Sequence, residues 1–206
     1  MSVIDQFLDI DFRKQPEYIR GFDEFGDDNL FGTYEDSVEM LSDDEINDLI
    51  MEQEQHGQEG ACVANAYCQG HEMLQALQFG AERVVHLSAI SVYKKIGRSA
   101  QSGAVVSHGM VQMRDVGALP LDNPENRARY GNLVMPNTGF RLPYPAPDWA
   151  VLAKQFRFDE YDVIKTLQGL KTALARRQPV IVGRQGHSIC YTKLMRRKAA
   201  LVAKYA

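Results

Sequence analysis

The sequence predicts an α+β fold in which helices come first and strands come last. Apolar residues recur with the 3.6-residue period of a helix in several runs between residues 61 and 116. After residue 178 there are three runs rich in β-branched and apolar residues, separated by glycines or by charged residues. Helices that precede a group of consecutive strands are typical of the α+β class. We therefore expect a helical lobe followed by an antiparallel β lobe.

The first element is an acidic N-terminal arm, residues 1–54, which we expect to be partly extended. Acidic residues recur along it, and such a segment repels itself and buries little surface. Ser42-Asp-Asp-Glu45 is a capping-box pattern, and Ile46 begins a group of apolar residues with helical spacing. This pattern predicts a short helix over 43–54. Aromatic residues spaced along the arm suit docking to a protein partner or to the domain formed by residues 55–206.

Three helices are predicted in the first half of the domain, over 61–77, 88–96 and 106–116. The first has an apolar face with helical spacing and ends at Phe79-Gly80. Prolines and asparagines are concentrated between residues 119 and 148, which predicts a long irregular loop there. A fourth helix is expected over 159–176.

The β lobe is predicted from three runs at 179–182, 188–194 and 199–205. Because Met195-Arg-Arg-Lys198 lies between the last two runs, we expect it to form the turn of a hairpin. The sequence contains no internal repeat and no low-complexity tract.

Cys62 is the strongest candidate for a catalytic residue. A turn bracketed by Gly57 and Gly60 leads into the predicted helix, which places Cys62 at the start of that helix. The unpaired N–H groups and the positive end of the helix dipole favour a thiolate over a neutral thiol at such a position. The position therefore predicts a nucleophilic cysteine.

His187 is the candidate base that would complete a cysteine and histidine pair. It follows the apolar run Pro179-Val-Ile-Val182, and Gly186 and Ser188 flank it at the start of a predicted strand. His71 lies nine residues after Cys62, which is half a helical turn out of phase, so its side chain should face elsewhere. Cys68 and Cys190 are expected to be buried core residues.

The residues around Cys62 resemble the papain-like cysteine peptidases, in particular a bacterial and bacteriophage branch. The resemblance is densest in Gln55-His-Gly-Gln-Glu-Gly-Ala-Cys-Val-Ala-Asn-Ala66 and continues in Met113-Arg-Asp-Val-Gly-Ala-Leu-Pro120. Residues 170–182 look like the family's helix and strand that precede its histidine. Together these matches cover roughly residues 55–206. The resemblance implies a two-lobed papain-like fold with the active cleft between the lobes.

The resemblance also implies a function and roles for individual residues. Cys62 would attack the peptide carbonyl as a thiolate, and His187 would protonate the leaving amine. The 125 positions between them match the family's spacing. The family takes one oxyanion N–H from a glutamine six residues before its nucleophile, where this chain has His56. Gln55 and Gln58 are the neighbouring alternatives, and we call these three residues the oxyanion candidates.

The family's ring-orienting asparagine, in an Asn-Ser-Trp-Gly motif, does not occur before residue 206. Our hypothesis is that the sequence is a fragment of a product that continues into this motif. The altered oxyanion position leaves a second interpretation open, a catalytically weak or inactive papain-like module that serves as a structural or docking component, for example of a phage virion. A peptidoglycan amidase uses the same chemistry, but its histidine typically follows its cysteine more closely.

Composition limits the remaining classes of function. The 206 residues carry a net charge of −4 at pH 7, which does not favour binding to nucleic acid. No metal-ligand pattern or phosphate-binding loop occurs, so we expect neither a metal nor a cofactor. Glu59 stands where secreted family members carry a disulfide cysteine, and the N-terminus does not read as a signal peptide. We expect a cytoplasmic or virus-packaged protein that does not span a membrane and whose substrate is a polypeptide.

Overall fold

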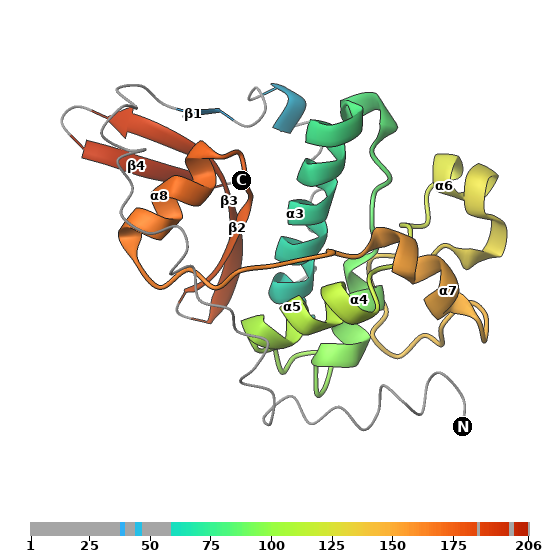
Figure 1. Cartoon of the computed structure of the whole chain (residues 1–206). Helices are drawn as coiled ribbons and strands as arrows, with labels where there is room; N and C mark the ends of the chain where they lie inside the picture. Colours follow the sequence, from blue (N-terminus) through green and yellow to red (C-terminus); the bar gives the residue numbers. More distant parts are fainter. Residues whose placement is uncertain (1–37, 40–43, 47–58, 185, 198–199, 206) are drawn as a thin grey trace.

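The computed structural model describes residues 38–39, 44–46, 59–184, 186–197 and 200–205 (Figure 1). Its helices are α3 (Cys62–Phe79), α4 (Ala89–Ile96), α5 (Val106–Asp115), α6 (Pro124–Tyr130), α7 (Trp149–Ala153) and α8 (Leu167–Ala175). Short 3-10 helices cover Ala81–Arg83 (η4), Gly131–Leu133 (η5) and Lys154–Phe156 (η6). The strands are β1 (Val38–Glu39), β2 (Val180–Arg184), β3 (His187–Arg197) and β4 (Ala200–Tyr205). The predicted α+β class is confirmed.

Helix α3 lies at the centre of the molecule, packed against β2 and β3 and also against α4 and α5 (Figure 1). Its close approach to the sheet depends on Gly70, where a Cβ atom would lie 3.1 Å from the Ile181 side chain and 3.8 Å from the Cys190 sulfur. The helix ends at Gly80, whose φ of 94° suits glycine. The predicted helix over 61–77 is confirmed, as are those over 88–96 and 106–116.

The sheet is antiparallel and is built around β3. Strand β2 pairs with the first part of β3, from Arg184↔His187 to Val180↔Tyr191. Strands β1 and β4 both pair with Lys193 and Leu194 of β3, so they lie on its opposite edges. The three predicted strands are confirmed in their order, whereas β1 was not predicted.

The boundary between β3 and β4 differs from the prediction. We expected a turn over 195–198, but β3 continues as far as Arg197. The backbones of Arg196 and Arg197 pair with Leu201 and Ala200. Charged residues near the end of a hairpin can either form its turn or extend its strands. The sequence pattern alone did not separate these two outcomes.

Two clusters of buried side chains form the core. The larger one joins α3, α4, α5 and α7. The smaller one, which includes Met73, lies between α3 and the sheet. Ile46 is 6% exposed and packs in the smaller cluster, together with Leu174 of α8. Residues 44–46 are helical, and the rest of the predicted helix over 43–54 lies outside the described residues.

The predicted irregular loop over 119–148 contains a helix, α6. The Asn123 side chain caps this helix by accepting a hydrogen bond of 2.8 Å from the Asn126 N–H, and Pro124 occupies its first position. An Asn-Pro pair is compatible with a turn and also with the start of a helix. Proline suits the first helical position because its φ is helical and its missing N–H needs no partner there. The prediction that this stretch is irregular throughout is therefore wrong.

The predicted helix over 159–176 begins later than expected. Helix α8 starts at Leu167, after Thr166 caps it by accepting a hydrogen bond of 3.0 Å from the Gly169 N–H. The preceding residues, 157–166, are not helical and run between the helical lobe and α8 (Figure 1). This segment forms part of a pocket between the lobes.

Within the described ranges, no helix is both long enough and apolar enough to cross a bilayer. The same residues contain no cluster of three or more histidine, cysteine or acidic side chains that could hold a metal ion.

Candidate functional site

Cys62 is the first residue of α3, as the sequence predicted. Its side chain is partly buried and packs against the larger core cluster. Ala61 precedes the helix and has no side chain that could cap it, while the Ala61 carbonyl accepts hydrogen bonds from the Asn65 backbone and side chain. The first N–H groups of a helix have no partner within the helix. The backbone around Cys62 therefore offers donors beside the sulfur.

His187 is the first residue of β3 and its side chain is exposed. It follows Gly186, whose φ of 79° is the left-handed conformation that glycine adopts in a tight turn. The next residue, Ser188, is buried, and its hydroxyl donates a hydrogen bond of 3.3 Å to the Val182 carbonyl. A left-handed glycine thus precedes His187 and a buried serine follows it, while His187 itself is exposed.

Helix α5 packs against the first turns of α3. At Gly109 of α5, a Cβ atom would lie 2.6 Å from the Tyr67 ring and 2.8 Å from a methyl of Val63. Such short distances mean that the two helices approach closely where α5 has no side chain. The beginning of α5 therefore lies beside the end of α3 that carries Cys62.

The same part of α5 also contacts the sheet. A Cβ atom at Gly183 would lie 2.9 Å from a methyl of Val106, the first residue of α5. Gly183 pairs with Ser188, the neighbour of His187 in β3. The first turn of α5 thus connects the end of α3 that begins with Cys62 to the end of β3 that begins with His187.

The residues before Cys62 are held by a close approach of two backbones. The Gly60 N–H donates a hydrogen bond of 2.6 Å to the Ala100 carbonyl. A Cβ atom at Gly60 would lie 2.5 Å from the Gly103 backbone nitrogen, and the Gly103 N–H itself donates to the Tyr93 hydroxyl at 3.1 Å. Only glycine fits at position 60. The sequence indicates that Gly60 belongs to a turn, but it carries no local signal of this contact, which joins residues about forty positions apart.

The oxyanion candidates Gln55, His56 and Gln58 lie outside the described residues. Their role as oxyanion donors therefore stays a prediction.

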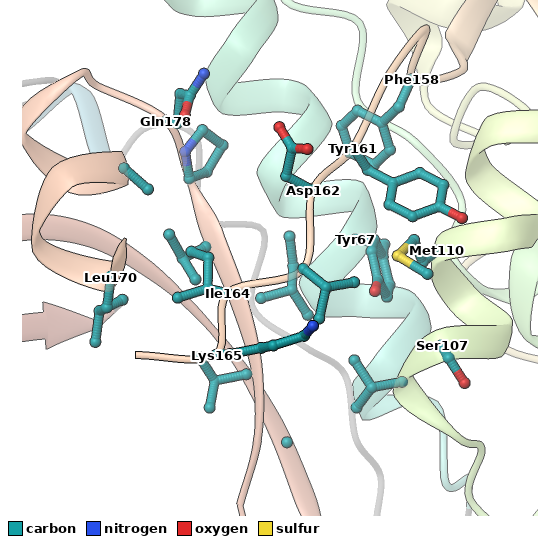
Figure 2. A pocket seen from close by; sticks show the side chains of 18 of the residues that line it. Tyr67, Ser107, Met110, Phe158, Tyr161, Asp162, Ile164, Lys165, Leu170 and Gln178 are labelled. Carbon is teal, nitrogen blue, oxygen red and sulfur yellow. The ribbon is translucent and has the colours of Figure 1, made fainter. Parts of the chain in front are cut away.

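A pocket of about 710 Å³ lies between the helical lobe and the sheet. Figure 2 shows Tyr67 and Met110 on its helical side, and Ile164 and Leu170 on the side of α8. Most of its wall is apolar. Charged residues of the 158–166 segment also line it, namely Glu160, Asp162 and Lys165.

The pocket reaches the contact between the two lobes. Its wall includes Val106 and Gly183, the two residues whose contact links the ends that carry Cys62 and His187. Neither Cys62 nor His187 itself lines the pocket. This pocket was not predicted from the sequence, because residues 158–166, which form part of its wall, were expected to lie mostly within a helix.

The other two cysteines are buried, which confirms the prediction for both. Burial raises the pKa of the Cys190 thiol to about 12. Burial, with a smaller contribution from the nearby Glu72 carboxylate, also raises the pKa of the Cys68 thiol well above its usual value. Both thiols are therefore almost entirely protonated near neutral pH.

Two further histidines pack against aromatic or acidic side chains. His71 packs against the rings of Phe156 and Phe158, so its ring is directed into the helical lobe. His86 lies with its Nδ1 3.5 Å from a carboxylate oxygen of the buried Glu72, and this contact raises the pKa of the His86 ring.

The structure resembles solved structures that include a cysteine protease. The structure of xylellain, a cysteine protease from Xylella fastidiosa, aligns with a TM-score of 0.57 at 16% sequence identity, covering 81% of this chain and 72% of that one. A structure from a study of the mite allergens Blo t 1 and Der p 1 aligns with a TM-score of 0.51 at 13% identity, covering 95% of this chain and 66% of that one. The fold is papain-like. No protein-family model and no curated protein sequence matches the chain.

The papain-like fold accounts for the order of the elements. Its helical lobe contains α3 with Cys62 at the start, and its β lobe contains β3 with His187 at the start. The structural alignments establish a shared fold, and at sequence identities of 16% and 13% they establish the fold alone. The chemistry depends on the residues that this chain carries.

Proposed function

We propose that this papain-like protein is a thiol peptidase that hydrolyses peptide bonds with a Cys62 thiolate and a His187 imidazolium. One observation supports the proposal most directly. The first residue of α3 and the first residue of β3 lie at ends that the first turn of α5 connects, in a fold that xylellain, a cysteine protease, shares. A nucleophile at a helix start and an exposed imidazole are the two groups that this chemistry needs.

The reaction follows from these groups. The Cys62 sulfur attacks the peptide carbonyl, and the carbonyl π electrons move to oxygen. The Cys62 backbone N–H and one of the oxyanion candidates donate to that oxygen. His187 then gives its proton to the amine as the carbon–nitrogen bond breaks, which leaves an acyl group on sulfur. His187 then takes a proton from water, and the resulting hydroxide attacks the thioester. The carbon–sulfur bond breaks, which releases the carboxylic acid and restores the Cys62 thiolate and the His187 imidazolium.

The substrate is a polypeptide, and the pocket between the lobes suits one of its apolar side chains. The pocket walls are mostly apolar, with Tyr67 and Met110 on one side and Ile164 on the other (Figure 2). Burying an apolar side chain of the substrate there would stabilise its complex with the enzyme by roughly 1.5–3 kcal/mol.

Selective alkylation tests this function. Because Cys190 has a pKa of about 12, only about one in 10⁴ of its thiols is ionised at pH 8, even before access is considered. We expect iodoacetamide to label Cys62 at least a hundredfold faster than Cys68 or Cys190, as measured by peptide mass spectrometry. Replacing His187 by alanine should slow the labelling of Cys62.

Cleavage of an unfolded protein substrate gives the second measurement. Cys62→Ala and His187→Ala should each abolish cleavage, whereas Cys68→Ser should retain it if the protein folds. Equal labelling of all three cysteines in the parent protein, together with no cleavage of any unfolded substrate, would refute the proposal. That result would favour the structural or docking module instead.

The finer predictions come from the sequence. The nucleophile motif suggests the origin, Glu59 and the N-terminus suggest the location, and the spaced aromatic residues of the arm suggest a partner. The solved structures compared are of xylellain and of mite allergens, and neither is a phage protein. A bacteriophage origin, a cytoplasmic or virion location, and a protein partner for the acidic arm therefore belong to the proposal. Purifying the protein from its native source with its associated proteins would test all three.

A further inference from the structure

Glu59 is three residues before Cys62, and its carboxylate is held by a turn far away in the sequence. The Phe140 N–H donates to Glu59 Oε1 at 2.8 Å. The Gly139 N–H lies 3.1 Å from the same oxygen and 3.3 Å from Oε2. Hydrogen bonds from backbone N–H groups to a carboxylate are stronger than those between neutral groups. Glu59 thus ties the start of α3 to residues 139–140.

The turn at residues 139–140 is itself fixed on α4. Lys94 donates a hydrogen bond of 2.6 Å to the Phe140 carbonyl, and its ammonium group lies 5.8 Å from the centre of the Phe140 ring. The Phe140 ring also packs against the Tyr93 ring, with 5.2 Å between centroids. Glu59 is therefore held by a turn that is itself attached to α4.

Residues 59–61 are also attached to α4 through Gly60. Gly60 donates to the Ala100 carbonyl, and Tyr93 of α4 donates to that carbonyl at 3.1 Å. The residues immediately before Cys62 are therefore attached to α4 on two sides. On one side the contact is between backbones, and on the other it depends on a single side chain, that of Glu59.

Glu59 is the residue among the three before Cys62 that can make such a contact, because Gly60 and Ala61 have no polar side chain. Helix α3 also lacks a side-chain cap at Ala61. The direction in which the chain enters α3, and with it the orientation of the Cys62 sulfur and N–H, therefore depends on the residues before the cap.

We propose that Glu59 is a positioning residue for Cys62, which holds the entry to α3 against residues 139–140 so that the sulfur and the Cys62 N–H face the substrate carbonyl. This inference rests on the proposed peptidase function. Small displacements of a reacting group are costly, since a shift of about 1 Å can lower a rate by about a hundredfold.

The test compares Glu59→Ala and Glu59→Gln with a matched control, Glu82→Ala. Glu82 also precedes a buried part of the helical lobe, but its side chain is 74% exposed. We expect Glu59→Ala to lower kcat by about tenfold to a hundredfold with KM within about twofold of the parent value. Glu59→Gln keeps an oxygen that can accept from Phe140, so its kcat should return to within about threefold of the parent value.

Hydrogen exchange supplies a readout that does not need activity. The amides of Gly139 and Phe140 should exchange faster in Glu59→Ala than in the parent protein, and at the parent rate in Glu82→Ala. If Glu59→Ala does not fold, Glu59→Gln decides the question. Its Gly139 amide loses the contact with Oε2 and should exchange faster than in the parent protein, and an unchanged exchange rate would overturn the inference.

The outcomes separate this inference from the proposed function. A parent protein that cleaves substrate, with a Glu59→Ala variant whose kcat equals that of Glu82→Ala, would overturn the positioning role and leave the peptidase intact. A higher KM at unchanged kcat would overturn it as well, because it would place Glu59 in substrate binding. A parent protein without a reactive Cys62 would overturn both.

Discussion

His71 is an ionisable side chain that the fold keeps largely away from water, and it should make stability depend on pH. Its ring centroid lies 5.4 Å from that of Phe158 and 6.4 Å from that of Phe156. Burial lowers the pKa of His71 from 6.5 to about 4. The folded protein therefore binds a proton at His71 much more weakly than the unfolded chain does.

The sign and size of the effect follow from the two pKa values. The contribution of His71 to stability is fully present above its unfolded pKa of 6.5 and is lost as the pH falls towards the folded pKa of about 4. Between pH 7 and pH 5 the loss amounts to about 2 kcal/mol, and the limit at low pH is about 3 kcal/mol. Such a change is a large part of the stability of an ordinary domain.

Replacing His71 by phenylalanine removes the titrating group and keeps a ring against Phe158. Gln75 loses its contact with His71 but keeps both hydrogen bonds to the Val85 backbone, so no buried amide is left without a partner. Urea unfolding at pH 7 and pH 5, followed by the fluorescence of Trp149, gives the free energy of unfolding of each protein. The parent protein should lose about 2 kcal/mol more than His71→Phe over this range.

The pair formed by the buried Glu72 and the partly buried His86 acts in the opposite direction. The Glu72 carboxylate raises the pKa of His86, so the stability gained there is present at low pH and is lost as the pH rises through the folded pKa. The pair is the same in both proteins and cancels in the difference between them. A parent protein that loses no more stability than His71→Phe would refute the argument that burial controls this ring.

Three further predictions concern the site and the fold. Gly60→Ala should destabilise the protein by about 3 kcal/mol or more and slow the labelling of Cys62, because its Cβ would lie 2.5 Å from the Gly103 backbone. Gly103→Ala should cost only about 1–2 kcal/mol, because no atom other than those of its chain neighbours lies within 4 Å of its Cβ. Thermal unfolding of both variants measures the difference. When the oxyanion candidates are replaced by alanine one at a time, one variant should lower kcat by about 10²–10³-fold with little change in KM. Equal kcat values for the three variants would contradict a role in stabilising the oxyanion. Thr166→Ala should cost about 1 kcal/mol in urea unfolding, since it removes the cap that accepts from Gly169, and an unchanged midpoint would count against that cap.

The sequence predicted the elements whose pattern is local. The helix that begins at Cys62 has a regular apolar face and a glycine at its end, so both of its boundaries were within one or two residues of those observed. The prediction placed the start of helix α8 too early, because the apolar residues of 158–166 fit a helical period. In the structure these residues are not helical and line the pocket. Periodicity alone cannot tell a helix from an extended segment that packs on one side.

The candidate site was predictable only in part. The position of Cys62 at a helix start follows from its flanking glycines, and that of His187 at a strand start from the apolar run before it. The contacts of Glu59 join residues about eighty positions apart, and nothing in the local pattern around residue 140 indicates them. Long-range contacts of this kind depend on the packing of the whole helical lobe.

The burial of Ile46 has a consequence for how the protein can be shortened. This side chain fills a place between α3 and α8, beside Met73 and Leu174, while β1 completes one edge of β3. A product that starts at residue 55 would leave that place empty and that edge unpaired. Loss of Val38, Glu39 and Ile46 should therefore lower the stability of the domain.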